Sequence, residues 1–254
     1  MSGKGGKGKE APPGNAARSG KRKTKPIQRK TKSAASDNVA ARAAVIDTAQ
    51  KMSREGLSPG RSGNVSCRFG QGMLITPSGL AYADLTVRDI VYVSGDGTAQ
   101  SDAPKPSSEW RFHLAAYQTR PDRHAVVHTH SLNATALACA GKAIPAFHYM
   151  VALAGGNDIP LVPYATFGTQ ELAGHVANGL RNRDACLMAN HGQIAISQSL
   201  AAALELAFEV EQLAAQYIKA LTIGPPVLLA DDEMERMVEK FRNYGENANK
   251  HARG

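Results

Sequence analysis

The spacing of apolar residues divides the chain from residue 37 onward into short strands and longer helices. Apolar residues three or four positions apart predict a helix over residues 37–56, and Asp37 is a suitable cap for it. The predicted buried face of this helix carries Val39, Ala43, Ile46 and Ala49. Further helices are predicted over residues 107–120, 132–140, 169–181, 199–220 and 231–243. Short apolar or alternating runs predict strands over residues 65–69, 73–76, 90–93, 125–130, 161–164, 185–188 and 193–197.

Strands that occur in runs, with helices between the runs, indicate a fold that combines both kinds of element. The pattern is typical of an α+β protein or of a three-layer α/β/α protein, and it does not decide between them. The chain of 254 residues is long enough for one large domain, and we see no internal repeat. We therefore predict one folded domain over residues 37–254.

The net charge of +8 comes from the first 36 residues. This segment contains eight Lys and three Arg against the single acid Glu10, whereas the remaining residues carry 19 basic and 21 acidic side chains. Met1 and Ile27 are its only large apolar residues, so we predict a disordered basic tail over residues 1–36. The tail is either a tether to nucleic acid or another polyanion, or a solvated extension. The second reading is favoured, because no aromatic residues are present for base stacking.

Cysteine content and hydropathy bear on the compartment. Cys67, Cys139 and Cys186 are an odd number in apolar surroundings, and we expect them to be buried thiols in a reducing compartment. No apolar run approaches the roughly 20 residues that a membrane helix needs. The charged N-terminus is not followed by the apolar stretch of a secretory signal. A cytoplasmic location without membrane association is expected.

Histidines at two strand ends provide the most informative chemistry. Side chains of a strand alternate between its faces, so His128 and His130 are expected to point the same way. His191 follows a neighbouring apolar strand and can complete the three-ligand pattern of a catalytic zinc site. A zinc ion bound in this way keeps a position open for substrate and stabilises negative charge that develops on oxygen.

A helix start and two turns predict an anion seat close to these histidines. Ser107, Ser108 and Glu109 stand at the beginning of a predicted helix, where backbone N–H groups and the helix dipole favour anions. The turns containing Gly63-Asn64 and Ser78-Gly79 can add further N–H donors. Each residue alone also has a structural explanation, such as helix capping by Ser107. Together they predict a carboxylate, a metal and a phosphate seat in one pocket.

Eight short motifs, in order along the chain, resemble the class II aldolase/adducin family. They are GNVS at 63–66, MLITP at 73–77, PSSEWRFH at 106–113, AVVHTH at 125–130, HYM at 148–150, PYATFG at 163–168, HG at 191–192 and EKFRNYG at 239–245. The resemblance extends from about residue 40 to 246 and leaves out only the tail. It implies a three-layer α/β/α fold with a central mixed, largely antiparallel sheet.

The resemblance also implies roles for individual residues. His128, His130 and His191 would hold one Zn²⁺ per subunit, and Glu109 would act as acid and base and also touch the metal. The residues implied for the phosphate seat are Gly63, Asn64, Ser78, Gly79, Ser107 and Ser108. Phe167 would shape the aldehyde side, and Tyr149 and Tyr244 would approach from a neighbouring subunit of a homotetramer with active sites between subunits. Asn190 stands where a histidine is common in the family, beside the third ligand.

The implied activity is that of a lyase. Family members of this kind reversibly cleave a ketose 1-phosphate, such as L-fuculose 1-phosphate, to dihydroxyacetone phosphate and an aldehyde such as L-lactaldehyde. A sugar-phosphate 4-epimerase of the ribulose-phosphate type and a methylthioribulose-phosphate dehydratase are alternatives on the same scaffold. A polyanion-binding protein that acts through its tail is the alternative without catalysis. This chemistry needs no Schiff-base lysine, and none of the lysines after residue 36 stands in an obvious nucleophile setting.

Overall fold

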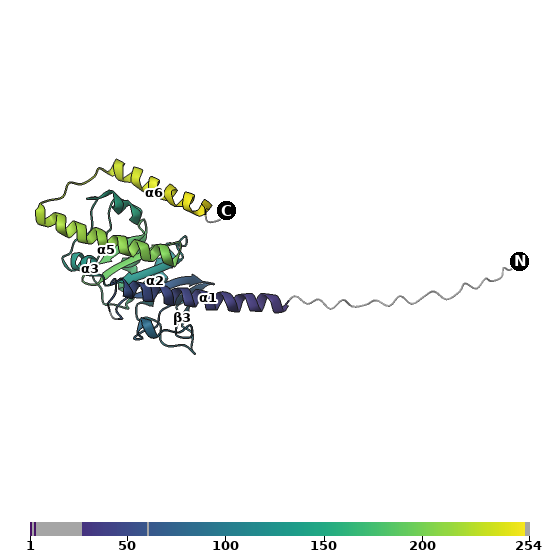
Figure 1. Cartoon of the computed structure of the whole chain (residues 1–254). Helices are drawn as coiled ribbons and strands as arrows, with labels where there is room; N and C mark the ends of the chain where they lie inside the picture. The colour runs from purple at the N-terminus through teal and green to yellow at the C-terminus, as the bar shows by residue number, and fades with distance from the viewer. Residues whose placement is uncertain (2, 4–26, 60, 252–254) are drawn as a thin grey trace. The chain divides into compact units, whose positions relative to one another are not determined.

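The structure is a computed structural model, and it describes residues 1, 3, 27–59 and 61–251. Only the backbone is described for residues 27–35 and 243–251. The chain divides into two compact units, Met1–Ser36 and Asp37–Gly254, and the second contains the sheet (Figure 1). Most of the predicted basic tail lies outside the described residues.

Seven strands form one sheet. They are β1 (Asn64–Phe69), β2 (Gly72–Ile75), β3 (Val91–Ser94), β4 (Ala125–Thr129), β5 (Leu161–Val162), β6 (Ala185–Met188) and β7 (Gly192–Ser197). Their order across the sheet is β3-β2-β1-β4-β7-β6-β5. Only the pairing of β5 with β6 is parallel, so the predicted mixed and largely antiparallel sheet is confirmed.

Six α-helices and two 3₁₀ helices are assigned in the described residues. They are α1 (Ile27–Arg54), α2 (Trp110–Thr119), α3 (Leu132–Cys139), α4 (Gln170–Leu180), α5 (Leu200–Ile223), α6 (Asp231–His251), η1 (Tyr82–Asp84) and η2 (Tyr149–Ala154). Helices α4 and α5 begin with the expected N-cap hydrogen bonds. The hydroxyl of Thr169 accepts from the N–H of Leu172 at 3.2 Å, and that of Ser199 accepts from the N–H of Ala202 at 3.2 Å.

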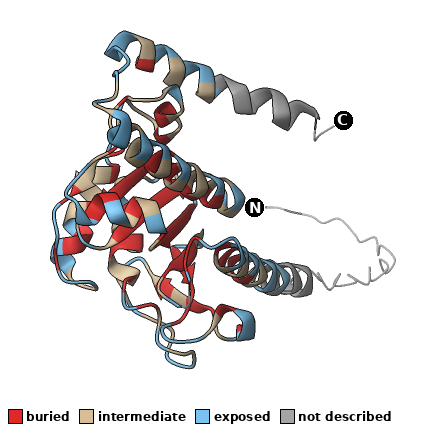
Figure 2. Ribbon diagram, turned by 60° about the vertical axis from the view of Figure 1, so that its left-hand side comes forward, coloured by how far each residue is buried: buried red, intermediate tan, exposed pale blue. Residues whose placement is uncertain are grey.

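Helices cover both faces of the sheet and create two cores. On one face, α2 and α4 contribute Phe112 and Val176 to a core that also contains Val126 of β4. On the other face, α3 and α5 pack with residues 37–54 of α1 against a core that contains the two neighbours of Val126, Ala125 and Val127. This alternation follows from the period of two in a strand. Figure 2 shows the buried residues gathered in the strands and on the inner sides of the helices.

Some expectations need correction. Helix α1 begins at Ile27, so Asp37 lies inside it and does not cap it; the preceding residues include Gln, Arg, Lys and Ala, which favour helix. Helix α6 reaches His251, beyond the expected end at residue 243. Val39 is 54% exposed, whereas Ile46 and Ala49 are buried as predicted. Cys139 is exposed, so only Cys186 of the three thiols is fully buried.

In the part of the chain that the structure describes, no helix has both the length and the apolar character needed to cross a membrane.

Candidate metal centre and anion-binding cavity

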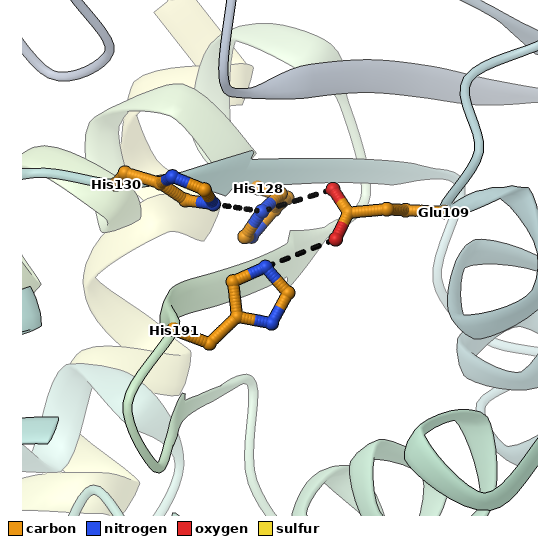
Figure 3. Close-up of side chains that lie close together, drawn as sticks. All are labelled: Glu109, His128, His130 and His191. Atoms are coloured by element: carbon orange, nitrogen blue, oxygen red, sulfur yellow. Dashed lines mark hydrogen bonds and ion pairs between the residues drawn. The ribbon is translucent and has the colours of Figure 1, made fainter. Parts of the chain in front are cut away.

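Three imidazole rings converge at the ends of two neighbouring strands. His128 is on β4, His130 follows that strand directly, and His191 occupies the turn between β6 and β7. The Nε2 atoms of His128 and His130 are 3.0 Å apart, and each pair of the three rings has its centroids 4.9 or 5.0 Å apart. Figure 3 shows the rings facing a common centre, with Glu109 opposite them. The structure brings these four predicted residues together.

The neighbouring strand sets the orientation of His128. Its Nδ1–H donates to the main-chain oxygen of Gln193 on β7, at 2.8 Å. In the neutral ring, the other nitrogen then carries a lone pair and points to the centre. His128 is completely buried, so this arrangement is held inside the protein.

Glu109 closes the group from the opposite side. It is the residue that precedes α2, and its carboxylate oxygens lie 3.2 Å from Nε2 of His128 and 2.9 Å from Nε2 of His191. Burial alone would raise the pKa of this carboxyl, but the contacts with His128 and His191 hold it well below its ordinary value. Glu109 is therefore an ionised carboxylate in a buried position.

The four side chains fit a divalent cation. Their ligand atoms all lie within 4.8 Å of one another. Burial and the neighbouring histidines lower the pKa of His130 to about 3, so the ring is neutral and able to coordinate. Nitrogen lone pairs and carboxylate oxygens at these distances repel one another unless a proton or a cation lies between them. Imidazole and carboxylate are ligands that zinc accepts at catalytic sites.

Two glycines allow the chain to approach these ligands closely. A Cβ atom on Gly192 would lie 2.4 Å from the main-chain oxygen of Thr129 and 3.0 Å from Cδ2 of His130. A Cβ atom on Gly63 would lie 2.6 Å from the main-chain oxygen of His128. Neither position has room for a side chain, so glycine is required to keep β1 and β7 against β4.

The turn that presents His191 has an unusual backbone. Asn190 is the only residue other than glycine with a positive φ, 54°, in the described residues. Asparagine tolerates this left-handed conformation better than most residues. Its N–H donates to the main-chain oxygen of Ala138 at 3.3 Å, which ties the turn to the end of α3.

A cavity of about 340 Å³ opens beside the metal centre. All six residues expected at the phosphate seat line this cavity, together with Glu109, His130, His191 and Phe167. The six are Gly63, Asn64, Ser78, Gly79, Ser107 and Ser108. No lysine lines the cavity in the part of the chain that is described. The structure thus brings together the predicted ligands, the carboxylate and the anion seat.

Arg61 gives the seat a positive charge that the sequence analysis missed. It lines the same cavity, and its Nη1 donates to the main-chain oxygen of Gly79 at 2.7 Å. Its position two residues before the Gly63-Asn64 turn was the available signal. The six predicted seat residues supply only uncharged donors, so Arg61 adds electrostatic attraction for a phosphate dianion.

Asn64 differs from its expected use. Its side-chain amide donates to Glu109 at 2.8 Å, and its oxygen contacts Nε2 of His113. The side chain therefore supports the carboxylate, and at this residue only the backbone is free to face an anion.

The expected aromatic residues have separate locations. Phe167 lines the cavity and is 63% exposed, and Tyr164, which the sequence analysis missed, lies beside it with 59% exposed. Tyr164 belongs to the same PYATFG motif as Phe167, which was the available signal. Tyr149 is not among the lining residues; its ring stacks on His148 and Phe241. Tyr244 falls where side chains lie outside the described residues.

Comparison with known proteins shows the family to which the chain belongs. Residues 43–218 match the family described as Class II Aldolase and Adducin N-terminal domain. The chain is 53% identical over 210 residues to a 5-methylthioribulose-1-phosphate/5-deoxyribulose-1-phosphate aldolase of Rhodospirillum rubrum, covering 83% of this chain and 95% of the relative. It is 52% identical over 202 residues to the L-fuculose phosphate aldolase of Escherichia coli, covering 79% and 94%.

A solved structure of an L-fuculose 1-phosphate aldolase has the same fold. It superposes with a TM-score of 0.78 at 41% identity, over 80% of this chain and 96% of that one. The expected three-layer fold and the expected lyase class are confirmed by these relatives. The chain belongs to the class II aldolase and adducin family.

Proposed function

We propose that the protein is a zinc-dependent aldolase that reversibly cleaves a ketose 1-phosphate to dihydroxyacetone phosphate and an aldehyde. L-fuculose 1-phosphate, which yields L-lactaldehyde, or a similar sugar phosphate is the proposed substrate. The observation that carries the proposal is that one cavity combines the His₃–Glu group with a seat for an anion. A ketose 1-phosphate has its carbonyl and its phosphate close together, and such a cavity can bind both groups at once.

The metal ligands would be His128, His130 and His191, with Glu109 beside them. One zinc ion per subunit, when bound, would supply a positive charge that polarises the ketose oxygens and stabilises the negative charge that develops on them as the carbon–carbon bond breaks.

The other residues of the cavity would handle the proton and the phosphate. In cleavage, Glu109 delivers the proton that the carbon next to the carbonyl takes up once its bond to the aldehyde carbon has broken, and in the reverse reaction it removes that proton. Its two oxygens already lie beside the histidines, so little movement is needed to reach a substrate in the cavity. The hydroxyls of Ser107 and Ser108, the turns at Gly63 and Gly79, and the guanidinium of Arg61 hold the phosphate. Fixing this remote group orients the reacting carbons.

The aldehyde side is proposed to lie between subunits of a homotetramer. Phe167 contacts the aldehyde fragment. A phenol of a neighbouring subunit, Tyr149 or Tyr244, removes the proton from the hydroxyl that becomes the aldehyde oxygen in cleavage and returns it in the reverse reaction. Tyr149 is available for such a contact, because the residue is 47% exposed in the single chain.

Two named relatives bear on the substrate. L-fuculose phosphate and 5-deoxyribulose 1-phosphate share the ketose phosphate end and differ in the aldehyde that they release. This supports a common dihydroxyacetone phosphate half, with the aldehyde as the variable part. It also favours an aldolase over the epimerase and dehydratase alternatives.

The domain boundaries remain part of the proposal. Residues 37–254 form the catalytic domain of a cytoplasmic enzyme, and residues 1–36 are a tail that catalysis does not need. Removal of residues 1–36 should leave kcat and KM unchanged.

The test is direct. Purified protein loaded with zinc is incubated with L-fuculose 1-phosphate or 5-deoxyribulose 1-phosphate, and dihydroxyacetone phosphate is trapped by a coupled reduction. We expect cleavage of at least one substrate, and Glu109→Gln should retain zinc but lose most turnover. Conversion of ribulose 5-phosphate to xylulose 5-phosphate, with no cleavage of either ketose 1-phosphate, would show an epimerase instead.

A further inference from the structure

Behind Glu109, a row of buried polar side chains runs away from the cavity. Asn64 Nδ2 is 2.8 Å from Glu109 Oε2, and Asn64 Oδ1 is 2.5 Å from Nε2 of His113. Nδ1 of His113 is 2.7 Å from the hydroxyl of Ser66, which is 2.9 Å from the hydroxyl of Tyr117. All five residues are at most 5% exposed. The row is therefore largely shielded from solvent.

Two regular elements create this row. Asn64 and Ser66 are two residues apart on β1 and point to the same face of the sheet. His113 and Tyr117 are four residues apart on α2 and lie on the same side of that helix. The strand and the helix thus alternate in supplying hydrogen-bonding groups, and Glu109, directly before α2, is the last member.

The direction of every hydrogen bond follows from Glu109. The ionised carboxylate can only accept, so the Asn64 amide donates to it, and the Asn64 oxygen must accept from His113. Burial is the main cause that lowers the pKa of His113 to about 3, so the ring carries a single N–H, at Nε2. Its Nδ1 accepts from Ser66, whose oxygen in turn accepts from Tyr117.

We propose that His113 is a positioning residue for the cleavage reaction, acting on Glu109 through Asn64. The Nε2–H of His113 holds the Asn64 amide in the orientation that presents N–H to Glu109. Rotation of the amide by 180° would place its oxygen next to the carboxylate. The two acceptors would repel each other, and the carboxylate would move from its position. His113 does not line the cavity, so it reaches the substrate only through these two residues. The inference rests on the aldolase function proposed above.

Two substitutions of similar polarity separate positioning from mere packing. His113→Gln keeps an N–H donor near the place of Nε2, whereas His113→Asn is too short to donate there but can still contact Ser66. We expect kcat to fall about 10–100-fold in His113→Asn, with KM changed less than about threefold. Losses of this size are usual for residues that orient a ligand or catalytic group by hydrogen bonds. His113→Gln should recover most of the kcat. Equal kcat values in the two variants would overturn the proposal.

A double-mutant cycle tests whether the effect passes through Asn64. In an Asn64→Ala background, His113→Asn should lower kcat by no more than about twofold further, because its target is gone. An effect as large as in the wild type would contradict the inference. Zinc content and unfolding by urea, measured on each variant, identify any variant that has lost its fold.

A measurement on the unmodified protein covers the case of variants that do not fold. Imidazole ¹⁵N chemical shifts of the wild type should show His113 as the neutral ring protonated at Nε2. A ring protonated at Nδ1 would overturn the proposed direction of the row. This readout does not involve substrate, so it tests the hydrogen-bond directions separately from the proposed function. A wild type that cleaves no ketose 1-phosphate would refute the proposed function, and the positioning role in cleavage would be refuted with it.

Discussion

The metal centre and the aromatic rim of the cavity, Tyr164 and Phe167, differ in how the chain supports them. His128 is completely buried and Glu109 is 5% exposed, and each is held by hydrogen bonds to a neighbouring strand. The aromatic rim is 59–63% exposed. One chain therefore suffices to build the centre, whereas the rim has surface left for a substrate or another subunit to cover.

This difference assigns chemistry and specificity to separate regions. Buried ligands in fixed positions are suited to a step that all related substrates share. Exposed aromatic side chains can be exchanged without disturbing the core, so they are suited to select one aldehyde from another. The comparison makes substitutions in the centre and in the rim distinguishable by experiment.

The largest effect is expected from His128→Ala. Loss of one of three imidazole ligands should remove most of the bound zinc and lower kcat/KM by about a thousandfold or more. Metal analysis and the cleavage assay check this, with His175→Ala on α4 as a control away from the site. Full activity of the His128→Ala protein without bound zinc would contradict the claim that the metal centre supplies the chemical step.

Gly192→Ala should weaken the centre without removing a ligand. The added methyl would lie 3.0 Å from the ring of His130 and even closer to the backbone of Thr129. We expect the zinc affinity to fall by about 10–100-fold, as when a metal ligand loses its supporting contacts.

A matched control exists for this glycine. Gly174→Ala, on α4, places a methyl where nothing lies within 4 Å apart from the adjoining residues and backbone of its own helix, and it should leave the zinc affinity unchanged. If competition with a chelator gives equal affinities for both variants, the close packing of β7 on β4 does not position His130.

The buried side of the comparison also predicts a pH dependence. The pKa of His113 falls from 6.5 to about 3 in the folded chain, mainly through burial. Above pH 6.5 the ring is neutral in the folded and in the unfolded chain. Between pH 6.5 and about 3, the unfolded chain binds a proton at this ring and the folded chain does not. The free energy of unfolding should therefore fall by up to about 1.4 kcal/mol per pH unit as the pH is lowered through this window.

His113→Gln lacks this titration and serves as the comparison. Urea unfolding of metal-free protein at pH 7, 6, 5 and 4 should give a shallower decline for the variant than for the wild type. Parallel curves would mean that His113 takes up a proton in the folded state.

The smallest effect is expected in the rim. Phe167→Ala should leave the zinc content unchanged and alter the ratio of kcat/KM between two ketose 1-phosphates by about threefold to tenfold. An unchanged ratio, or a loss of zinc, would remove Phe167 from the aldehyde side.

The first two ligands could be predicted because their arrangement is local. His128 and His130 are two residues apart at a strand end, and this spacing alone puts both rings on one face. Glu109 and the two serines precede a helix that its apolar pattern already marked. The start of α1 was harder, since residues 27–36 have good helix propensity but almost no apolar periodicity.

The supporting contacts could not be predicted from the sequence. Arg61 reaches Gly79 because β1 pairs with β2. Asn64 joins His113 and Glu109 because one face of β1 packs against α2. These pairs are 18 to 49 residues apart, and no periodicity relates them. The positive φ of Asn190 likewise depends on the way in which the β6–β7 turn meets α3.

Anomalous diffraction at the zinc edge, from crystals of the zinc-loaded protein, tests the central claim most directly. The account predicts one peak per chain, about 2.0–2.1 Å from Nε2 of His128, His130 and His191. A peak at another place, or none at these three rings in protein that cleaves its substrate, would contradict it.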